Sequence, residues 1–273
     1  MKKAILWILA FIITLSTAVY QRITGPTYPI RGKVELNGRN ISYELPRTHE
    51  TGKDCPVSIE TADPEIAGYL IYKRFKTADH WTTILMERKN NQLTAEIPSQ
   101  PPAGKLEYKI ILSSPTEEKS LTGEEPVIIR FKGHVPLGVL IPHVFVMFMA
   151  MLFGIRAGLE ALRKDSNPQL LAIITTALLI AGGFILGPLV QKYAFGTLWS
   201  GFPLGTDLTD NKTLIALIGW IAALIAGRKG QPARKWVLAA SLIQFIIFLI
   251  PHSLLGSELD YSKIDSMNNG FKP

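Results

Sequence analysis

The sequence predicts a mixed fold: an extracytoplasmic antiparallel β-sandwich joined to an α-helical membrane bundle. Two observations predict it. Residues 1–20 and 135–255 are mostly apolar, with their charges gathered in short connections, whereas residues 25–133 are polar and alternate as strands do. We expect residues 1–24 to form an N-terminal membrane anchor or signal peptide, 25–133 a sandwich, 134–256 a four-helix transmembrane domain, and 257–273 an extracytoplasmic tail.

The first apolar run, Ala4–Tyr20, follows Lys2 and Lys3. A basic start before an apolar core is typical both of a retained anchor and of a cleavable signal peptide, and Ser16-Thr17-Ala18 loosely resembles a cleavage site. The two alternatives stay open at this point. Either one exports the domain that follows.

Four further apolar runs lie at about residues 135–155, 169–190, 213–227 and 236–251. Each approaches the ~20 residues that cross a bilayer core. Basic residues lie unevenly on the two sides: nine on one (Lys2, Lys3, Arg156, Arg163, Lys164, Arg228, Lys229, Arg234, Lys235) and four on the other (Lys192, Lys212, Lys263, Lys272). The positive-inside rule then predicts a multi-pass protein of the bacterial inner (cytoplasmic) membrane. Its N-terminus is inside, and its soluble domain and C-terminus are outside.

The polar segment reads as a series of short strands. Two alternating runs flank Asn37-Gly38, a strong signal for a two-residue hairpin turn. Further strands are expected at residues 57–60, 69–75, 81–87, 93–97, 106–112 and 127–131, separated by turn residues. Short strands at this spacing, without helical periodicity, predict an antiparallel sandwich.

One part of this segment resembles a known family. Tyr69–Phe75, then Trp81, then Leu93–Pro98, then Gly104 followed by Tyr108 is similar to the order in fibronectin type III and Ig-like domains of exported bacterial proteins. The resemblance covers about residues 30–132. It implies a sandwich that spaces, stiffens or binds partner proteins, and it implies no ligand.

The tetrapeptide LIPH occurs twice, ending at His143 and at His252, and each copy lies at the outer end of a predicted span. Histidine beside proline at a helix end is ordinarily an interfacial side chain that reaches water. The alternative is that His143 and His252 converge, because ionisable groups in spans are functional candidates. Two imidazoles could hold a haem or share a metal ion.

The outer loop 191–212 combines aromatic and acidic residues. Its aromatic residues are expected at a membrane interface or against the sandwich: Tyr193, Phe195, Trp199 and Phe202. Asp207 and Asp210 are expected to cap the following helix, with Asp210 as the N-cap. Alternatively, Asp207 and Asp210 join His143, His252, Glu258 and Asp260 in an outward polar pocket that could hold a divalent ion or pass protons.

Several function classes are disfavoured. The net charge of +7 orients the spans, and no basic run carries base-stacking aromatics, so we expect no nucleic acid. A transporter is less expected, because the spans show no buried charge pair. The single cysteine, Cys55, is expected to be a buried thiol. Gln244 is expected to form an interhelical hydrogen bond.

The sequence therefore predicts a membrane scaffold or accessory subunit, in contact with the lipid bilayer, that engages an extracytoplasmic protein through its sandwich. The alternative is a haem- or metal-binding redox subunit that uses His143 and His252. The cofactor is not defined by the sequence. Gly154 and Gly158 form a GxxxG motif, which favours close helix packing within the protein or in a homo-oligomer.

Overall fold

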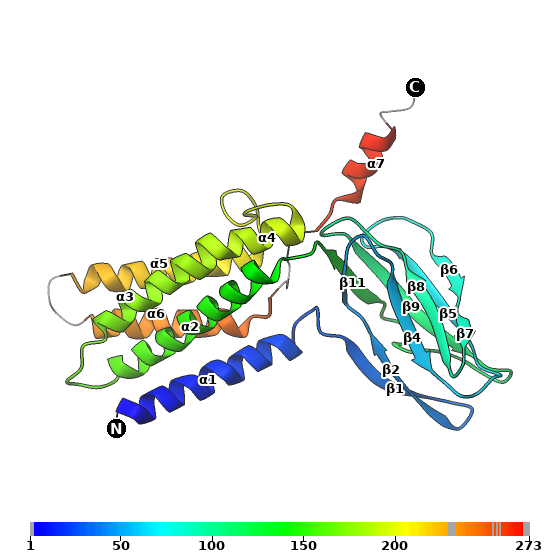
Figure 1. The fold of residues 1–273 in the computed structure, drawn as a ribbon, viewed down its shortest axis with the longest axis horizontal. Coiled ribbons are helices and arrows are strands. Elements are labelled where there is room, and N and C mark those ends of the chain that lie inside the picture. Colours follow the sequence, from blue (N-terminus) through cyan, green and yellow to red (C-terminus); the bar gives the residue numbers. More distant parts are fainter. Residues whose placement is uncertain (1–2, 229–232, 253, 255, 257, 270–273) are drawn as a thin grey trace. The chain divides into compact units, whose positions relative to one another are not determined.

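The computed structural model describes all of the chain except residues 1–2, 229–232, 253, 255, 257 and 270–273. The chain forms two compact units (Figure 1). A helical unit comprises residues 1–26 and 135–257, and a β unit comprises residues 27–134 and 258–273. The predicted mixture of sheets and apolar helices is confirmed. Lys2, Lys229 and Lys272, which were counted in the charge asymmetry, lie outside the described residues.

The helical unit contains α1 (Lys3–Ile23), α2 (Leu137–Ala161), α3 (Gln169–Leu179), α4 (Gly187–Phe195), α5 (Leu208–Ala226) and α6 (Arg234–Leu249). A π-helical segment, η1 (Ile180–Leu186), joins α3 to α4 without a break. Within the described part of the chain, four helices are long and apolar enough to cross a membrane: α1, α2, the continuous stretch from α3 to α4, and α5.

Helix α6 was predicted as a fifth span but has only 16 residues. At ~1.5 Å per residue it is about 24 Å long, which is short of a ~30 Å hydrocarbon core. It nevertheless packs against α1, α2 and α5. By length alone, α6 does not qualify as a span.

The outward faces of these helices are strongly apolar. Large side chains are exposed on every one of them, including Ile8, Phe145, Ile173, Ile218 and Ile246. The interior instead uses small residues, with Ala150, Ala157, Ala172, Ala216 and Ala240 almost fully buried. Small residues inside and large apolar residues outside are typical of helices that pack closely together in lipid. This arrangement indicates membrane association.

The β unit has three sheets. A hairpin joins β1 (Ile30–Leu36) to β2 (Arg39–Leu45). A six-stranded sheet has the order β3 (Thr48–Glu50), β11 (Val127–Lys132), β9 (Lys105–Ser113), β5 (Ala67–Arg74) and β6 (Thr82–Leu85), with β10 (Glu118–Ser120) also paired to β9. A three-stranded sheet has the order β4 (Cys55–Glu60), β8 (Gln92–Ile97) and β7 (Glu87–Lys89).

The three sheets share one hydrophobic core, which includes Leu36 of the hairpin, Ile59 and Ile97 of the three-stranded sheet, and Leu70 and Phe131 of the six-stranded sheet. Alternation explains this: β4 and β9 turn every second residue into the core. A side chain at Gly68 in β5 would collide with Met86 and Leu93, so glycine allows β5 and β8 to approach.

The predicted hairpin is confirmed, because Asn37 and Gly38 both have positive φ and Leu36 pairs with Arg39. Cys55 is buried, as expected, and burial raises the pKa of its thiol to about 11. The pairing departs from the prediction at one place: β3 runs parallel to β11. The other strand pairs of the described chain are antiparallel.

Candidate functional site

The C-terminal segment that was expected to be a plain tail instead forms helix α7 (Tyr261–Asn269) in the β unit. Asp260 begins the helix, because its carboxylate accepts hydrogen bonds from the backbone N–H and the hydroxyl of Ser262 at 3.1 and 2.6 Å. The backbone also docks: Leu259 N–H donates to the Ala103 carbonyl at 3.1 Å. We call residues 258–269 the tail segment.

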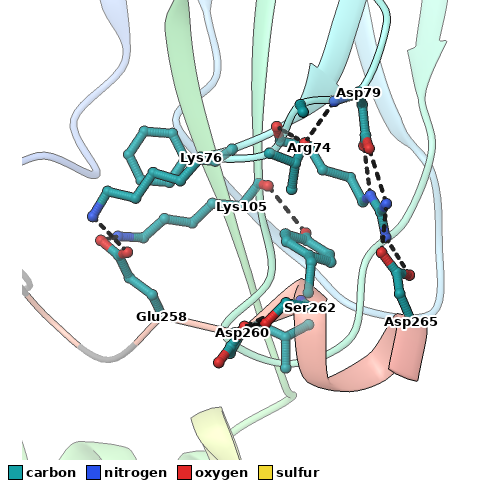
Figure 2. A pocket seen from close by; sticks show the side chains of 13 residues that line it. Arg74, Lys76, Asp79, Lys105, Glu258, Asp260, Ser262 and Asp265 are labelled. Atoms are coloured by element: carbon teal, nitrogen blue, oxygen red, sulfur yellow. Dashed lines mark hydrogen bonds and ion pairs between the residues drawn. The ribbon is translucent and has the colours of Figure 1, made fainter. Parts of the chain in front are cut away.

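Arg74, near the end of β5, fixes the tail segment to the sheet (Figure 2). Its guanidinium donates to both carboxylate oxygens of Asp265 at 2.8 and 2.9 Å. It also donates to both oxygens of Asp79, at 2.6 and 3.0 Å. The second pair orients the guanidinium toward the tail and holds the pKa of Asp79 below its ordinary value. Two-point pairing makes such a contact specific in geometry.

Two lysines hold the other end of the tail segment. The Glu258 carboxylate accepts from the Lys105 ammonium at 2.8 Å and from the Lys76 ammonium at 2.9 Å. Burial works against the charge on Glu258, but the hydrogen bonds from both lysines outweigh it and lower its pKa. Burial also lowers the pKa of Lys105, although Glu258 opposes the shift. Both lysines lie over the ring of Phe75.

Tyr261 lies between the two charged ends. Its ring is 6% exposed and lies 5.0 Å from the Arg74 guanidinium carbon. Its hydroxyl oxygen lies 3.0 Å from both Gln100 Oε1 and the Lys105 carbonyl oxygen, either of which can accept its single proton. Burial raises the pKa of this hydroxyl to about 12. The tail is therefore held by an acid, an aromatic ring and a second acid.

A pocket that is partly open to solvent lies beside the tail segment. It has a volume of about 600 Å³ and is lined by residues 74–79, Lys105 and residues of the tail. We call this region, with Arg74, Lys76 and Lys105 as its cations, the cationic groove. Its cations bind one carboxylate that precedes a short helix, Glu258, and one on that helix, Asp265. Of the residues that line it, Glu258 and Asp260 were singled out in the sequence, for a different pocket, whereas the three cations were not.

In the helical unit, His143 of α2 is oriented by a hydrogen bond to the backbone of the following helical stretch. Its Nδ1 lies 3.0 Å from the Gly182 carbonyl oxygen, which also accepts from the Gly187 backbone N–H in the π-helical turn. Pro142 lies inside α2, in its second turn. Among the described residues, Nε2 of His143 forms no hydrogen bond, and a histidine held through its other ring nitrogen is common among those that bind metals.

His252 follows α6 and is exposed. It lies near enough to Lys212, His143 and Asp207 for their charges to act on its ring. Lys212 was expected in a loop, but it is buried in the first turns of α5 and donates to the Ile250 carbonyl at 2.8 Å. The two histidines of the repeated LIPH therefore lie in one region of the helical unit.

The two loop aspartates have structural roles, and the predicted cap was wrong. The N-cap of α5 is Asp207, which accepts from Thr209 N–H at 2.8 Å, and not Asp210. Asp210 instead accepts from the backbone N–H groups of Ser200 and Gly201 at 2.7 and 3.0 Å and thereby shapes the loop. Both residues satisfy the preference for an N-cap, so composition alone could not separate them.

The predicted outward pocket draws on residues of both units. Glu258 and Asp260 belong to the β unit and have the partners described above, and the pocket as a whole stays a prediction. Among the described residues, no group of three or more His, Cys, Asp or Glu side chains could hold a metal ion. Metal or haem binding by His143 and His252 stays a prediction.

The predicted interface aromatics differ in exposure. Tyr193 and Phe202 are 47% and 69% exposed. Trp199 stacks on Phe184 at 5.4 Å between ring centroids and donates to the Phe202 carbonyl at 3.1 Å. Phe195 is half-buried at the end of α4. The exposed rings of this loop suit a membrane interface.

Gln244 forms the predicted interhelical hydrogen bonds. Its Oε1 accepts from Trp220 Nε1 at 2.6 Å, and its Nε2 donates to the Ala150 carbonyl at 3.0 Å, so one amide links α6, α5 and α2. Gly154 lies directly against Gln244, and Gly158 lies directly against Ser241. Both glycines are thus used in packing within the chain.

The expectation that the spans contain no buried charge pair was wrong. Arg156 and Glu160 of α2 form an ion pair at 2.6 Å, with side chains 4% and 10% exposed. The Trp7 ring of α1 covers the Arg156 guanidinium at 5.3 Å. The predicted span ended at residue 155, whereas α2 continues to Ala161, so the pair falls inside the helix. Its i, i+4 spacing was a signal that the sequence offered.

Comparison with known proteins adds no family to this description. No protein-family model matches the chain, and no curated protein is significantly similar to it. Function must therefore be argued from the geometry itself.

Proposed function

We propose that the chain is a membrane-anchored scaffold or accessory subunit that presents the β unit, a fibronectin III-like β-sandwich, to a protein partner outside the cytoplasm. The single observation that carries the proposal is the cationic groove. It binds a helical segment by two clamped carboxylates and an aromatic ring, which is a protein-recognition mode.

Support for the sandwich comes from the shared core. The three-stranded and six-stranded sheets both turn alternate residues into it, and the hairpin β1–β2 adds Leu36, Ile41 and Leu45. The strands β5, β6, β8 and β9 lie in the segments that carry the resemblance. The parallel pair of β3 and β11 is a departure from an all-antiparallel sandwich.

Support for the topology comes from two independent features. Basic residues predominate in the connections expected in the cytoplasm. The tail segment belongs to the β unit, so the chain between residues 134 and 258 must leave and return to one side of the membrane. Only an even number of crossings allows this. Since α2, the α3–α4 stretch and α5 supply three, we propose that the short helix α6 is the fourth.

Support for a retained anchor comes from the packing of α1. Leu6 and Ala10 are fully buried, Trp7 covers Arg156, and Gln21 Nε2 donates to the Phe248 and Ile250 carbonyls at 2.8 and 3.1 Å. A cut after Ala18 would remove the first three contacts. We therefore propose that α1 remains part of the mature helical unit.

The test is photo-crosslinking of the full chain in cells. A photoreactive residue replaces Ala78, which is exposed and lines the groove, or Lys53, which is exposed in a turn and does not line it, as the matched control. We expect a protein adduct from position 78 and little from position 53. Equal adducts from both positions, or none from position 78, would contradict partner binding at the groove.

A second candidate function is metal or haem binding at His143 and His252. The observation that favours it is the orientation of His143 by the Gly182 carbonyl, together with the nearness of His252. The measurement is the metal content and visible spectrum of the purified chain, alongside His143→Ala and His252→Ala. Loss of a bound metal or haem in either variant supports this candidate, and a wild type without either group rejects it.

A further inference from the structure

The tail segment is an unusual occupant for the cationic groove. Its charged contacts are partly exposed: the Arg74 and Asp265 side chains are 30% and 46% exposed, and Glu258 is 32% exposed. Ion pairs this exposed contribute little to stability and are weakened by salt. A partly open pocket of about 600 Å³ lies beside the tail segment and is lined by both the tail and residues of the β unit.

The groove residues themselves are well fixed without the tail. Asp79 orients the Arg74 guanidinium from within the β unit, through two hydrogen bonds. Lys105 also has a neighbour that does not belong to the tail, because its ammonium lies over the Phe75 ring. Preorganised cations are suited to bind the carboxylates of another molecule, because their side chains lose little conformational entropy on binding.

Resting on the proposed function, we infer that the tail segment is a displaceable internal ligand, and that the partner is a protein with an acidic helical segment that replaces it. The required features are those that the tail presents: carboxylates at positions equivalent to Glu258 and Asp265, and an aromatic ring at the position of Tyr261. Arg74 then receives one carboxylate and Lys76 with Lys105 the other. The tail sets the affinity that a partner needs in order to bind, because an attached ligand competes at an effective concentration on the order of millimolar.

The test uses the chain in detergent, either complete or shortened to residues 1–257, and a fluorescent peptide of residues 258–269. We expect the shortened chain to bind the peptide. The complete chain should bind it at least about tenfold more weakly, since its own tail competes. Fluorescence anisotropy gives both affinities, and the melting curve of each chain shows that it is folded.

Matched variants test the contacts. In the shortened chain, Arg74→Gln should weaken binding roughly tenfold or more, equivalent to ~1.4 kcal/mol, whereas Lys53→Gln should leave it unchanged. A peptide with Glu258→Gln and Asp265→Asn should lose affinity to a similar extent. A different helical peptide that keeps only the two acids and the tyrosine at their spacing should still bind.

Three results would overturn the inference: no peptide binding by the shortened chain, equal binding by the complete chain, or equal binding of a scrambled peptide of the same composition. Equal binding of the scrambled peptide would mean that the groove recognises negative charge without regard to its spacing. An adduct from position 78 together with any of these results would leave the proposed partner binding in place and reject only the displaceable tail.

Discussion

The hydrogen bond between Trp220 and Gln244 offers a quantitative test of the helical unit. Trp220 is fully buried and Gln244 is 2% exposed, so neither side chain can turn to water when its partner is lost. Trp220→Phe leaves Oε1 of the amide without its donor. Gln244→Met, which keeps the length of the side chain, leaves the indole N–H unpaired. Each change should destabilise the fold by about 1–3 kcal/mol, the cost of an unsatisfied buried polar group.

The double variant should cost less than the sum of the single variants, because the second change removes a group that is already unpaired. Hydrogen bonds between membrane helices give couplings of ~0.6 kcal/mol on average and up to ~1.7. We expect a value toward the upper end, about 1 kcal/mol, because the N–O distance is only 2.6 Å and the site is buried. The assay is reversible denaturant unfolding in mixed micelles.

The control pairs Trp220→Phe with Leu170→Ala, since the Leu170 side chain is 67% exposed and faces away from the core. These two changes should add within ~0.3–0.5 kcal/mol. If Trp220→Phe and Gln244→Met were equally additive, the reasoning about the buried amide would be refuted. The two side chains would then lie together without a shared bond.

Three further outcomes are expected. Glu160→Gln should destabilise the helical unit by about 3 kcal/mol or more in the same assay, because it leaves the buried Arg156 without its counter-charge. Arg163→Gln should cost under ~1 kcal/mol. Similar losses in the two variants would contradict the burial argument. Because the pKa of Glu258 is lowered in the folded chain, its ion pairs stabilise the docked tail at pH values above its unfolded pKa of ~4.3, and this stabilisation is lost as the pH falls through the lower folded pKa. Spin labels at Lys53→Cys and Met267→Cys should report a fixed distance at pH 7 and a broadened distance distribution below about pH 4. An unchanged distance at pH 3 would argue against electrostatic docking. The mass of the chain purified from membranes should include helix α1, and a mass that lacks it would show that this helix is cleaved.

Local signals predicted much of the fold. The Asn37-Gly38 turn and the alternation of β4 and β9 are properties of a few neighbouring residues, and they were read correctly. The strands β3, β7 and β10 were not predicted, since each has only three residues and is defined by its hydrogen bonds to a neighbouring strand. Secondary structure of this kind depends on contacts that no short window contains.

The candidate site could not be predicted in the same way. Arg74 and Asp265 are 191 positions apart, and each alone reads as an ordinary surface charge. The tail is short and polar, so it has no hydrophobic periodicity from which a docked helix could be predicted. The choice between Asp207 and Asp210 as N-cap also depended on the path of the preceding loop. By contrast, the role of Gln244 was predictable, because a polar amide within an apolar run must find a partner.

The most direct test of the proposed architecture is the accessibility of single cysteines to a membrane-impermeant maleimide in intact cells. The only native cysteine, Cys55, is buried, so introduced cysteines report alone. Lys53→Cys lies in the β unit, Asp165→Cys between α2 and α3, and Arg228→Cys between α5 and α6; all three positions are exposed. We expect labelling of position 53 in intact cells, and of positions 165 and 228 only after permeabilisation. Labelling of position 228 in intact cells would show that α6 does not cross and would contradict a β unit held outside by four returning helices.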